Sequence, residues 1–210
     1  MNKVRSIFAA NRWFFGVFLF FFGAGLIFLL TEGKVTSFIY LNPYHRNDLD
    51  TFFMYLTFLG DGLFAVIVIA LFLLMRRWRA AVQVLTAFLL SALVAQVLKN
   101  VFSMPRPMQF FAPGQYPYFI TGVTHIGFAS FPSGHSTSIF ALATTMALLE
   151  KNKKANVAYL LIAVAVGYSR IYLGQHFLGD VLMGSLIGMG VAVGVNWLFS
   201  KKFHSRPANP

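Results

Sequence analysis

The stretch from Trp13 to Leu30 contains 18 consecutive residues without one charged or strongly polar side chain. A helix of this length rises about 27 Å, close to the ~30 Å thickness of a bilayer's hydrocarbon core. Basic residues precede the stretch, as they do in a signal peptide, but the apolar run is too long for one and no small-residue cleavage site follows it. We therefore expect an uncleaved membrane-spanning helix.

Composition extends this expectation to the whole chain. Of the 210 residues 58% are hydrophobic and 11% are charged, and the mean hydropathy is +0.68, which a soluble domain of this size rarely reaches. We predict an all-α fold, a single membrane domain over residues 1–210. Its bundle of six transmembrane helices covers residues 13–31, 54–75, 80–99, 134–149, 157–173 and 177–199. The fourth is short and rich in Ser and Thr, so we expect it inside the bundle.

The net charge of +11 does not indicate a nucleic-acid partner, because the basic residues form no single patch. The positive-inside rule explains most of them: with both termini inside, the inner segments hold 12 of the 17 Lys and Arg residues. The outer segments hold Lys34, Arg46, Lys99, Arg106 and Arg170. The absence of cysteine excludes disulfides, cysteine-ligated metals and thiol catalysis.

Three further patterns leave alternatives open. The aromatic residues of segment 100–133 could anchor it at the membrane interface or shape a groove for acyl or prenyl chains. Residues 32–50 form another outer segment, with a short interfacial helix and a solvated group of His45, Arg46, Asp48 and Asp50. The pairs Gly184/Gly188 and Gly190/Gly194 favour helix packing inside the monomer over a dimer interface.

Residues that could take part in catalysis or bind an anion lie at the outer ends of the predicted spans. His176 and Asp180 are four residues apart and would share one face at the start of the sixth helix. A carboxylate there can accept a hydrogen bond from one imidazole nitrogen and leave the other nitrogen free to attack. Alone, this pair could equally be a capping or packing feature.

The segment Pro132-Ser133-Gly134-His135 has the features of a helix start. Ser133 is a suitable N-cap, and Gly134 would let an anion approach the exposed N–H groups closely. His135 would lie in the first turn, facing the same space. A cap with an incidental histidine is the simpler alternative for this segment taken by itself.

Three cations complete the pattern, since Lys99 and Arg106 flank the outer end of the third span and Arg170 ends the fifth. Snorkelling to the interface could explain each one separately, but together with the two histidines they predict one anion site. Asp61 could pair with a cation of this site or serve helix entry. We expect no metal site, because no second carboxylate joins the histidines at ligand spacing.

The three segments together resemble the signature motifs of the type 2 phosphatidic acid phosphatase (lipid phosphate phosphatase) superfamily. The matching residues are Lys99-x6-Arg106-Pro107, Pro132-Ser133-Gly134-His135 and Ser169-Arg170-x5-His176-x3-Asp180. The resemblance implies a six-helix core, no cofactor and a phosphohistidine intermediate. His176 would be the nucleophile, Asp180 its orienting partner and His135 the acid, while Lys99, Arg106, Ser133, Gly134 and Arg170 would hold the phosphate.

The expected function is therefore that of an integral-membrane phosphatase acting on a lipid phosphomonoester or pyrophosphate at the outer leaflet. The family suggests phosphatidylglycerophosphate, phosphatidic acid, undecaprenyl pyrophosphate or lipid A phosphate as substrate, in a bacterial plasma membrane with the site facing the periplasm or exterior. A lipid phosphotransferase that uses the same phosphohistidine is one alternative. A non-catalytic lipid-phosphate binder or transporter is the other; it would need the cations but not the catalytic set of His135, His176 and Asp180.

Overall fold

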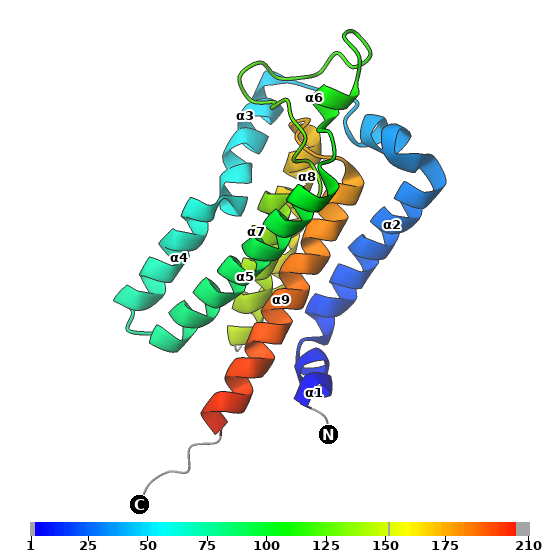
Figure 1. Cartoon of the computed structure of the whole chain (residues 1–210). Helices are drawn as coiled ribbons and strands as arrows, with labels where there is room; N and C mark the ends of the chain where they lie inside the picture. The colour runs from blue at the N-terminus through cyan, green and yellow to red at the C-terminus, as the bar shows by residue number, and fades with distance from the viewer. Residues whose placement is uncertain (1–2, 151, 205–210) are drawn as a thin grey trace, which may run out of the picture.

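A computed structural model describes residues 3–150 and 152–204, in which all regular secondary structure is helical. The elements are α1 (Lys3–Ala10), α2 (Arg12–Leu41), α3 (Asn47–Leu56), the 3-10 turn η1 (Thr57–Gly60), α4 (Gly62–Leu74), α5 (Trp78–Phe102), α6 (Pro107–Phe110), α7 (Gly134–Leu149), α8 (Lys153–Tyr172) and α9 (Leu178–His204). The predicted all-α class is confirmed. Figure 1 shows α2 on one flank, α3 and α4 on the other, and α5, α7, α8 and α9 between them.

The two ends of the bundle differ. Figure 1 places α1, the α4–α5 turn and the last turn of α9 at one end, and the long segment between α5 and α7 at the other, which we call the loop end. The structure does not describe all of the basic residues from which the orientation was predicted. Lys151 and Arg206 lie outside the described residues, as do the side chains of Lys3, Lys153, Lys154, Lys201 and Lys202.

Six membrane spans are not confirmed. In the described part of the chain, four helical segments are long and apolar enough to cross a membrane: Arg12–Leu41, Trp78–Phe110, Ala155–Tyr172 and Leu178–Ser200. A fifth exists if Asn47–Gly60 and Gly62–Leu74, which meet at 54°, form one bent span. The remaining prediction, 134–149, coincides with α7, but 16 residues rise only about 24 Å, short of the hydrocarbon core.

Helix α7 is instead the interior element of the bundle, as its Ser and Thr content predicted. Ten of its side chains are buried, and its most extensive packing is against α9. Gly184 and Gly188 make this approach possible: a Cβ at Gly184 would lie 2.7 Å from the Ser133 carbonyl oxygen, and one at Gly188 would overlap the Thr137 carbonyl. Packing inside the monomer is thus confirmed for this glycine pair.

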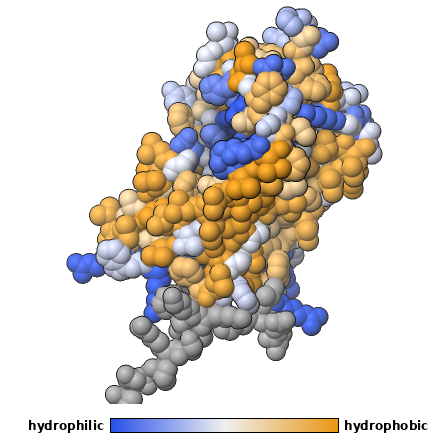
Figure 2. Space-filling model, in the orientation of Figure 1, coloured by the Kyte–Doolittle hydropathy of each residue, from blue (hydrophilic) through white to orange (hydrophobic). Residues whose placement is uncertain are grey.

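The other glycine pair of α9 has no such role in the described residues, where a Cβ at Gly190 or Gly194 would meet no atom within 4 Å. Both glycines therefore lie on the open surface of the helix. Large apolar side chains are exposed along the spans as well, for example Leu30 at 74% and Leu74 at 79%. Figure 2 shows such residues covering the helical middle of one face, with polar residues gathered toward the loop end. This surface suits hydrocarbon.

The first outer segment is more ordered than predicted. Helix α2 breaks at Gly33, whose φ of 77° glycine adopts without strain, and continues to Leu41, in agreement with a short interfacial helix. Arg46 and Asp48 form an exposed pair, as expected for a solvated loop, whereas the side chains of His45 and Asp50 are only 9% and 20% exposed. The prediction of a solvated group was therefore wrong for these two.

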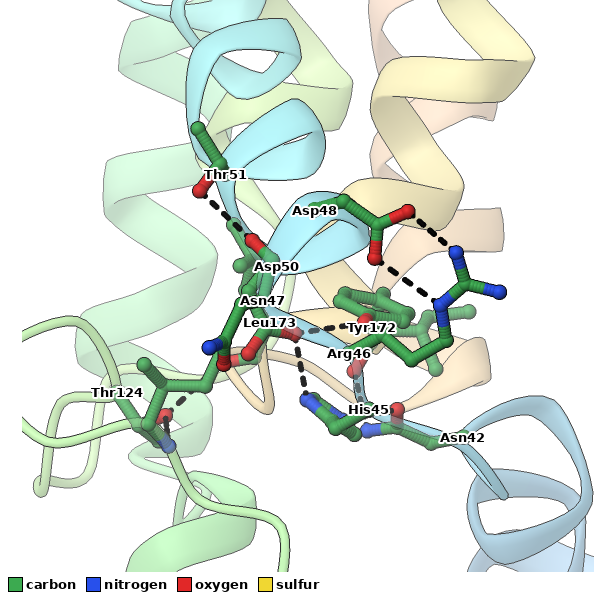
Figure 3. A network of polar contacts seen from close by, with 12 residues as sticks. Asn42, His45, Arg46, Asn47, Asp48, Asp50, Thr51, Thr124, Tyr172 and Leu173 are labelled. Carbon is green, nitrogen blue, oxygen red and sulfur yellow. Dashed lines mark hydrogen bonds and ion pairs between the residues drawn. The ribbon is translucent and has the colours of Figure 1, made fainter.

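His45 joins the end of α2 to α3 and α8 (Figure 3). Its Nδ1 lies 3.0 Å from Asp50 Oδ1 and its Nε2 lies 2.8 Å from Asn42 Oδ1. The Tyr172 hydroxyl donates to the same Asp50 oxygen at 2.6 Å. The imidazole stacks between the rings of Tyr118 and Tyr172. This network, which we call the outer clasp, secures α3 beside the last turn of α8.

The aromatic residues of the 103–133 segment divide into two groups. Phe111, Tyr116 and Phe119 pack inward around Phe38 and Phe177, whereas others, such as Phe128 at 59% exposure, face outward. This inward packing holds the segment against the end of α2 and the start of α9. Neither of the two roles considered from the sequence included this one.

Candidate active site

A cavity of about 500 Å³ lies at the loop end of the bundle. Six of the eight residues that the sequence singled out line it: Lys99, Arg106, Gly134, His135, Arg170 and His176. They come from the end of α5, the segment that follows it, the start of α7, the end of α8 and the α8–α9 connection. Ser133 and Asp180 lie behind this lining, at 0% and 5% exposure.

His176 and Asp180 form the deepest part of the site. His176 Nδ1 lies 3.5 Å from Asp180 Oδ2, and the imidazole is 2% exposed. Asp180 Oδ2 also accepts hydrogen bonds from the Ser130 hydroxyl at 2.5 Å and the Phe177 backbone N–H at 2.9 Å. The carboxylate is therefore held by these two donors, while the imidazole nitrogen faces it at ion-pair distance. Because Nδ1 faces Asp180, Nε2 is the nitrogen available to the cavity.

Burial sets the protonation state of this histidine. Desolvation lowers the pKa of His176 to about 4, with Arg170 and Arg106 acting in the same direction and the Asp180 carboxylate opposing them. The imidazole is thus neutral at pH 7, and a neutral imidazole has the free electron pair that nucleophilic attack requires.

The start of α7 contributes backbone rather than hydroxyl groups to the cavity. The Ser133 hydroxyl caps the helix: it accepts from the Ser136 backbone N–H at 3.3 Å and from the Ser136 hydroxyl at 2.9 Å. The Ser133 N–H in turn donates to the Asp180 carbonyl at 3.0 Å, which ties the start of α7 to α9. The structure thus places Gly134 and His135 on the cavity and Ser133 beneath it.

The three cations are held by neutral acceptors. Arg170 donates to the Thr57 hydroxyl at 2.7 Å, Arg106 to the Gln175 side-chain oxygen at 2.7 Å, and Lys99 to the Ala129 carbonyl at 2.5 Å. Among the described residues, none of the three makes a salt bridge with a carboxylate. The cavity therefore keeps an excess of positive charge that is oriented but not neutralised, which is the arrangement an anion needs.

Sequence reasoning missed several residues of this site. Thr57 and Gln175 orient the two arginines, and Ser130 orients Asp180. Their signal in the sequence is weak, because a lone Thr, Gln or Ser near a predicted helix end is common. His125, which the sequence gave no reason to include, lines the rim of the cavity. Asp61 lines it too, and its side chain accepts from the Leu63 N–H at 2.8 Å, so its helix-entry role is confirmed.

The described residues contain no group of three or more His, Cys, Asp or Glu side chains that could hold a metal ion. A separate cavity of about 420 Å³ between α2, α8 and α9 has an almost wholly apolar lining and contains none of the predicted site residues. The charged cavity is therefore the place for polar chemistry.

Comparison with known proteins agrees with this geometry. The sequence profile of the PAP2 superfamily matches residues 80–204. The lipid A 1-phosphatase of Rhizobium etli is 35% identical over 103 residues, which are 49% of this chain and 43% of that protein. This chain thus spans less than half of that relative. The undecaprenyl-diphosphatase BcrC of Bacillus subtilis is 33% identical over 159 residues, covering 74% of this chain and 76% of that protein.

The fold has a solved counterpart. The crystal structure of Aquifex aeolicus LpxE superposes with a TM-score of 0.69 at 27% identity, covering 77% of this chain and 93% of that one. The apolar helices that could cross a membrane support an integral membrane protein, as does the likeness to the solved transmembrane PAP2 type phosphatidylglycerolphosphate phosphatase of Bacillus subtilis, with a TM-score of 0.63 at 26% identity over 100% of both chains. The resemblance first drawn from three short motifs is confirmed, and the chain belongs to the PAP2 superfamily.

Proposed function

We propose that the protein is an integral-membrane lipid phosphate phosphatase. One observation carries the proposal: three cations, none of which forms a salt bridge with a carboxylate of the described residues, line one cavity with two histidines, and a hydrogen-bonded carboxylate lies behind the buried histidine. A lipid phosphomonoester or pyrophosphate fits this set, since its phosphate needs dispersed positive charge. The candidates are phosphatidylglycerophosphate, phosphatidic acid, undecaprenyl pyrophosphate and lipid A phosphate, and the names of the two relatives reported above support the last two.

Phosphate binding is assigned to the cations and to the start of α7. Lys99, Arg106 and Arg170 approach from three different segments, so they can neutralise the phosphate oxygens from several sides. Gly134 allows an oxygen close to the N–H groups of the helix start. Ser133 remains a predicted phosphate contact; its hydroxyl serves as the helix cap in this structure.

The reaction then proceeds in two steps. His176 Nε2 attacks phosphorus, the bond to the leaving oxygen breaks, and His135 gives that oxygen a proton. The phosphoryl group is now on His176, whose positive ring Asp180 stabilises. In the second step a water molecule attacks phosphorus while His135 takes its proton, the N–P bond breaks, and inorganic phosphate leaves. Fixed cations carry the charge on the transferred group throughout.

The lipid part needs a path into the bilayer. A cavity of about 200 Å³ shares Lys99, Gly134 and His135 with the charged one and continues between α4 and α5 over Phe88, Ala92 and Ala95. We assign it to the first part of an acyl or prenyl chain, whose remainder would lie among the exposed apolar side chains of α4 and α5. In this proposal the loop end faces the periplasm or the exterior of a bacterial plasma membrane, as the positive-inside rule requires.

The test is phosphate release by purified protein in detergent with EDTA, measured on a panel of these four lipid phosphates. We expect release from at least one of them, its loss in His176→Ala, and a strongly reduced rate in Asp180→Asn. Phosphate release that survives His176→Ala would contradict the covalent step. Transfer of labelled phosphate to a second lipid without release would replace the hydrolase by a phosphotransferase. Binding without either reaction would make the protein a lipid-phosphate binder.

A further inference from the structure

Asp61 occupies the bend between η1 and α4, where the two helical segments meet at 54°. One of its carboxylate oxygens, Oδ1, caps α4 by accepting from the Leu63 N–H at 2.8 Å. The other, Oδ2, lies 3.9 Å from His135 Nε2, and both residues line the charged cavity. The same side chain therefore serves the helix and faces the histidine that we assign as the acid.

The packing of Gly60 secures this position. A Cβ at Gly60 would lie 2.9 Å from Val166 Cγ1 and 3.0 Å from the carbonyl oxygen of His135, so only glycine lets the bend touch the start of α7. The next residue in the chain, Asp61, is thereby placed against the His135 ring. The bend thus places the Asp61 carboxylate at the cavity, although α4, which follows it, contributes no charged residue to the cavity lining.

The charges around His135 give this carboxylate its importance. Positive side chains face the ring from three segments: Lys99 from α5, Arg106 from the segment after it, and Arg170 from α8. His176 is the further titratable neighbour. Burial lowers the pKa of His135 to about 3, and all of these groups act in the same direction because each disfavours a positive imidazole ring. Asp180 is engaged by His176, Ser130 and the Phe177 N–H, so Asp61 is the carboxylate of the cavity lining that faces His135.

We propose that Asp61 is a positioning residue that favours the protonated form of His135, against the burial and the cations that disfavour it. This inference rests on the proposed phosphatase function. At 3.9 Å the pair is an ion-pair contact and not a hydrogen bond, so the imidazolium N–H stays free for the leaving group. In the second step the same carboxylate stabilises the positive ring that forms when His135 takes the proton of water.

The effect of losing the Asp61 carboxylate should depend on the leaving group of the substrate. An alkoxide, as in a phosphomonoester of a lipid alcohol, leaves poorly unless it is protonated, whereas p-nitrophenolate leaves readily without a proton. Loss of the acid's charge partner should therefore slow alkyl phosphates more than aryl phosphates. A purely structural defect would slow both alike.

Asp61→Asn is the decisive variant, because asparagine is as good an N-cap as aspartate and only the charge is lost. We expect the variant's kcat/KM for a short-chain alkyl phosphate at neutral pH to fall about three- to tenfold, and the alkaline limb of its pH profile to move down by about half a unit to one unit. The rate with p-nitrophenyl phosphate should change less than about twofold. The half-exposed position of Asp61, at 45%, limits the size of the effect.

The matched control is Asp48→Asn, which removes an exposed carboxylate from the neighbouring helix α3 outside the cavity and should leave both rates unchanged. If Asp61→Asn lowers stability, Asp61→Ser provides a second capping residue without charge. Equal slowing of both substrates, an unmoved alkaline limb, or a lower KM as the sole effect would each overturn the proposal. Wild-type protein inactive on every phosphate ester would instead overturn the proposed function.

Discussion

At the residue scale, the proposed site depends on groups that hold the reactive ones in place. Asp180 can orient His176 only if its own rotamer is fixed, and the Ser130 hydroxyl and the Phe177 N–H fix it. Thr57 and Gln175 do the same for Arg170 and Arg106. Such supporting residues determine how accurately a site is preorganised, although they never touch the substrate.

Ser130→Ala tests this support. The change removes a hydrogen bond to a charged acceptor, which is worth about 1.5–3 kcal/mol, so we expect kcat to fall about tenfold or more with little change in KM. Steady-state phosphate release measures both constants. Ser185→Ala is the control, because this buried hydroxyl donates only within its own helix, to the Leu182 carbonyl. An unaltered kcat in Ser130→Ala would show that Asp180 needs no such support.

At the element scale, Thr57 follows α3 directly as the first residue of η1, so its position beside Arg170 depends on the outer clasp that secures α3. Both nitrogens of His45 face acceptors, because the Asn42 amide nitrogen is engaged by the Ile171 carbonyl at 3.0 Å and leaves its oxygen to His45. The imidazole is also stacked against the rings of Tyr118 and Tyr172.

His45→Phe separates the hydrogen bonds of the clasp from its stacking. The aromatic ring is kept while the buried Asn42 and the half-buried Asp50 each lose a hydrogen-bond partner, so we expect a loss of about 1–3 kcal/mol in the free energy of unfolding. A thermal melt in detergent reports it as a lower Tm. Tyr44→Phe, at a neighbouring side chain that is 75% exposed, should leave Tm unchanged. Equal melting temperatures for the two variants would mean that the clasp contributes nothing to stability.

The α7–α9 contact makes a second prediction at this scale, through two glycines of one helix. Gly188→Ala would drive a methyl group into the Thr137 carbonyl and to 2.8 Å from the Ala141 nitrogen, so we expect destabilisation of at least about 1–3 kcal/mol. Gly190→Ala points into open space and should be neutral or stabilising by up to about 1 kcal/mol, because alanine favours the helix. The difference in Tm between the two variants is the measurement. A reversed order would contradict the packing described for α9.

At the scale of the whole molecule, the absence of cysteine makes the orientation directly testable. Ala112→Cys places a thiol at the loop end and Arg76→Cys places one at the opposite end, both at exposed positions. In intact cells or spheroplasts we expect a membrane-impermeant maleimide to label only the loop-end variant, and both after the membrane is permeabilised. Labelling of the Arg76→Cys variant alone in intact cells would reverse the proposed topology.

The sequence located the residues of the candidate site more completely than it located the membrane spans. Six of the eight predicted site residues line one cavity, because motif residues at helix ends meet wherever alternating spans bring those ends together. The number of spans did not follow in the same way. Helix α7 has the predicted bounds, but burial by its neighbours makes it an interior helix, and the second predicted span is bent at Asp61. Hydropathy alone reports apolar length and says nothing about which neighbours surround it.

The amino-acid sequence by itself determined that this chain is helical, apolar and equipped with two histidines, a carboxylate and three cations at helix ends, because composition, periodicity and motif spacing are local properties. Only the tertiary structure decided that Ser130 and Thr57 support the reactive groups and that Asp61 faces His135. These are relations between segments up to about a hundred residues apart. Packing between helices sets them, and no local pattern encodes the direction in which a bend will point.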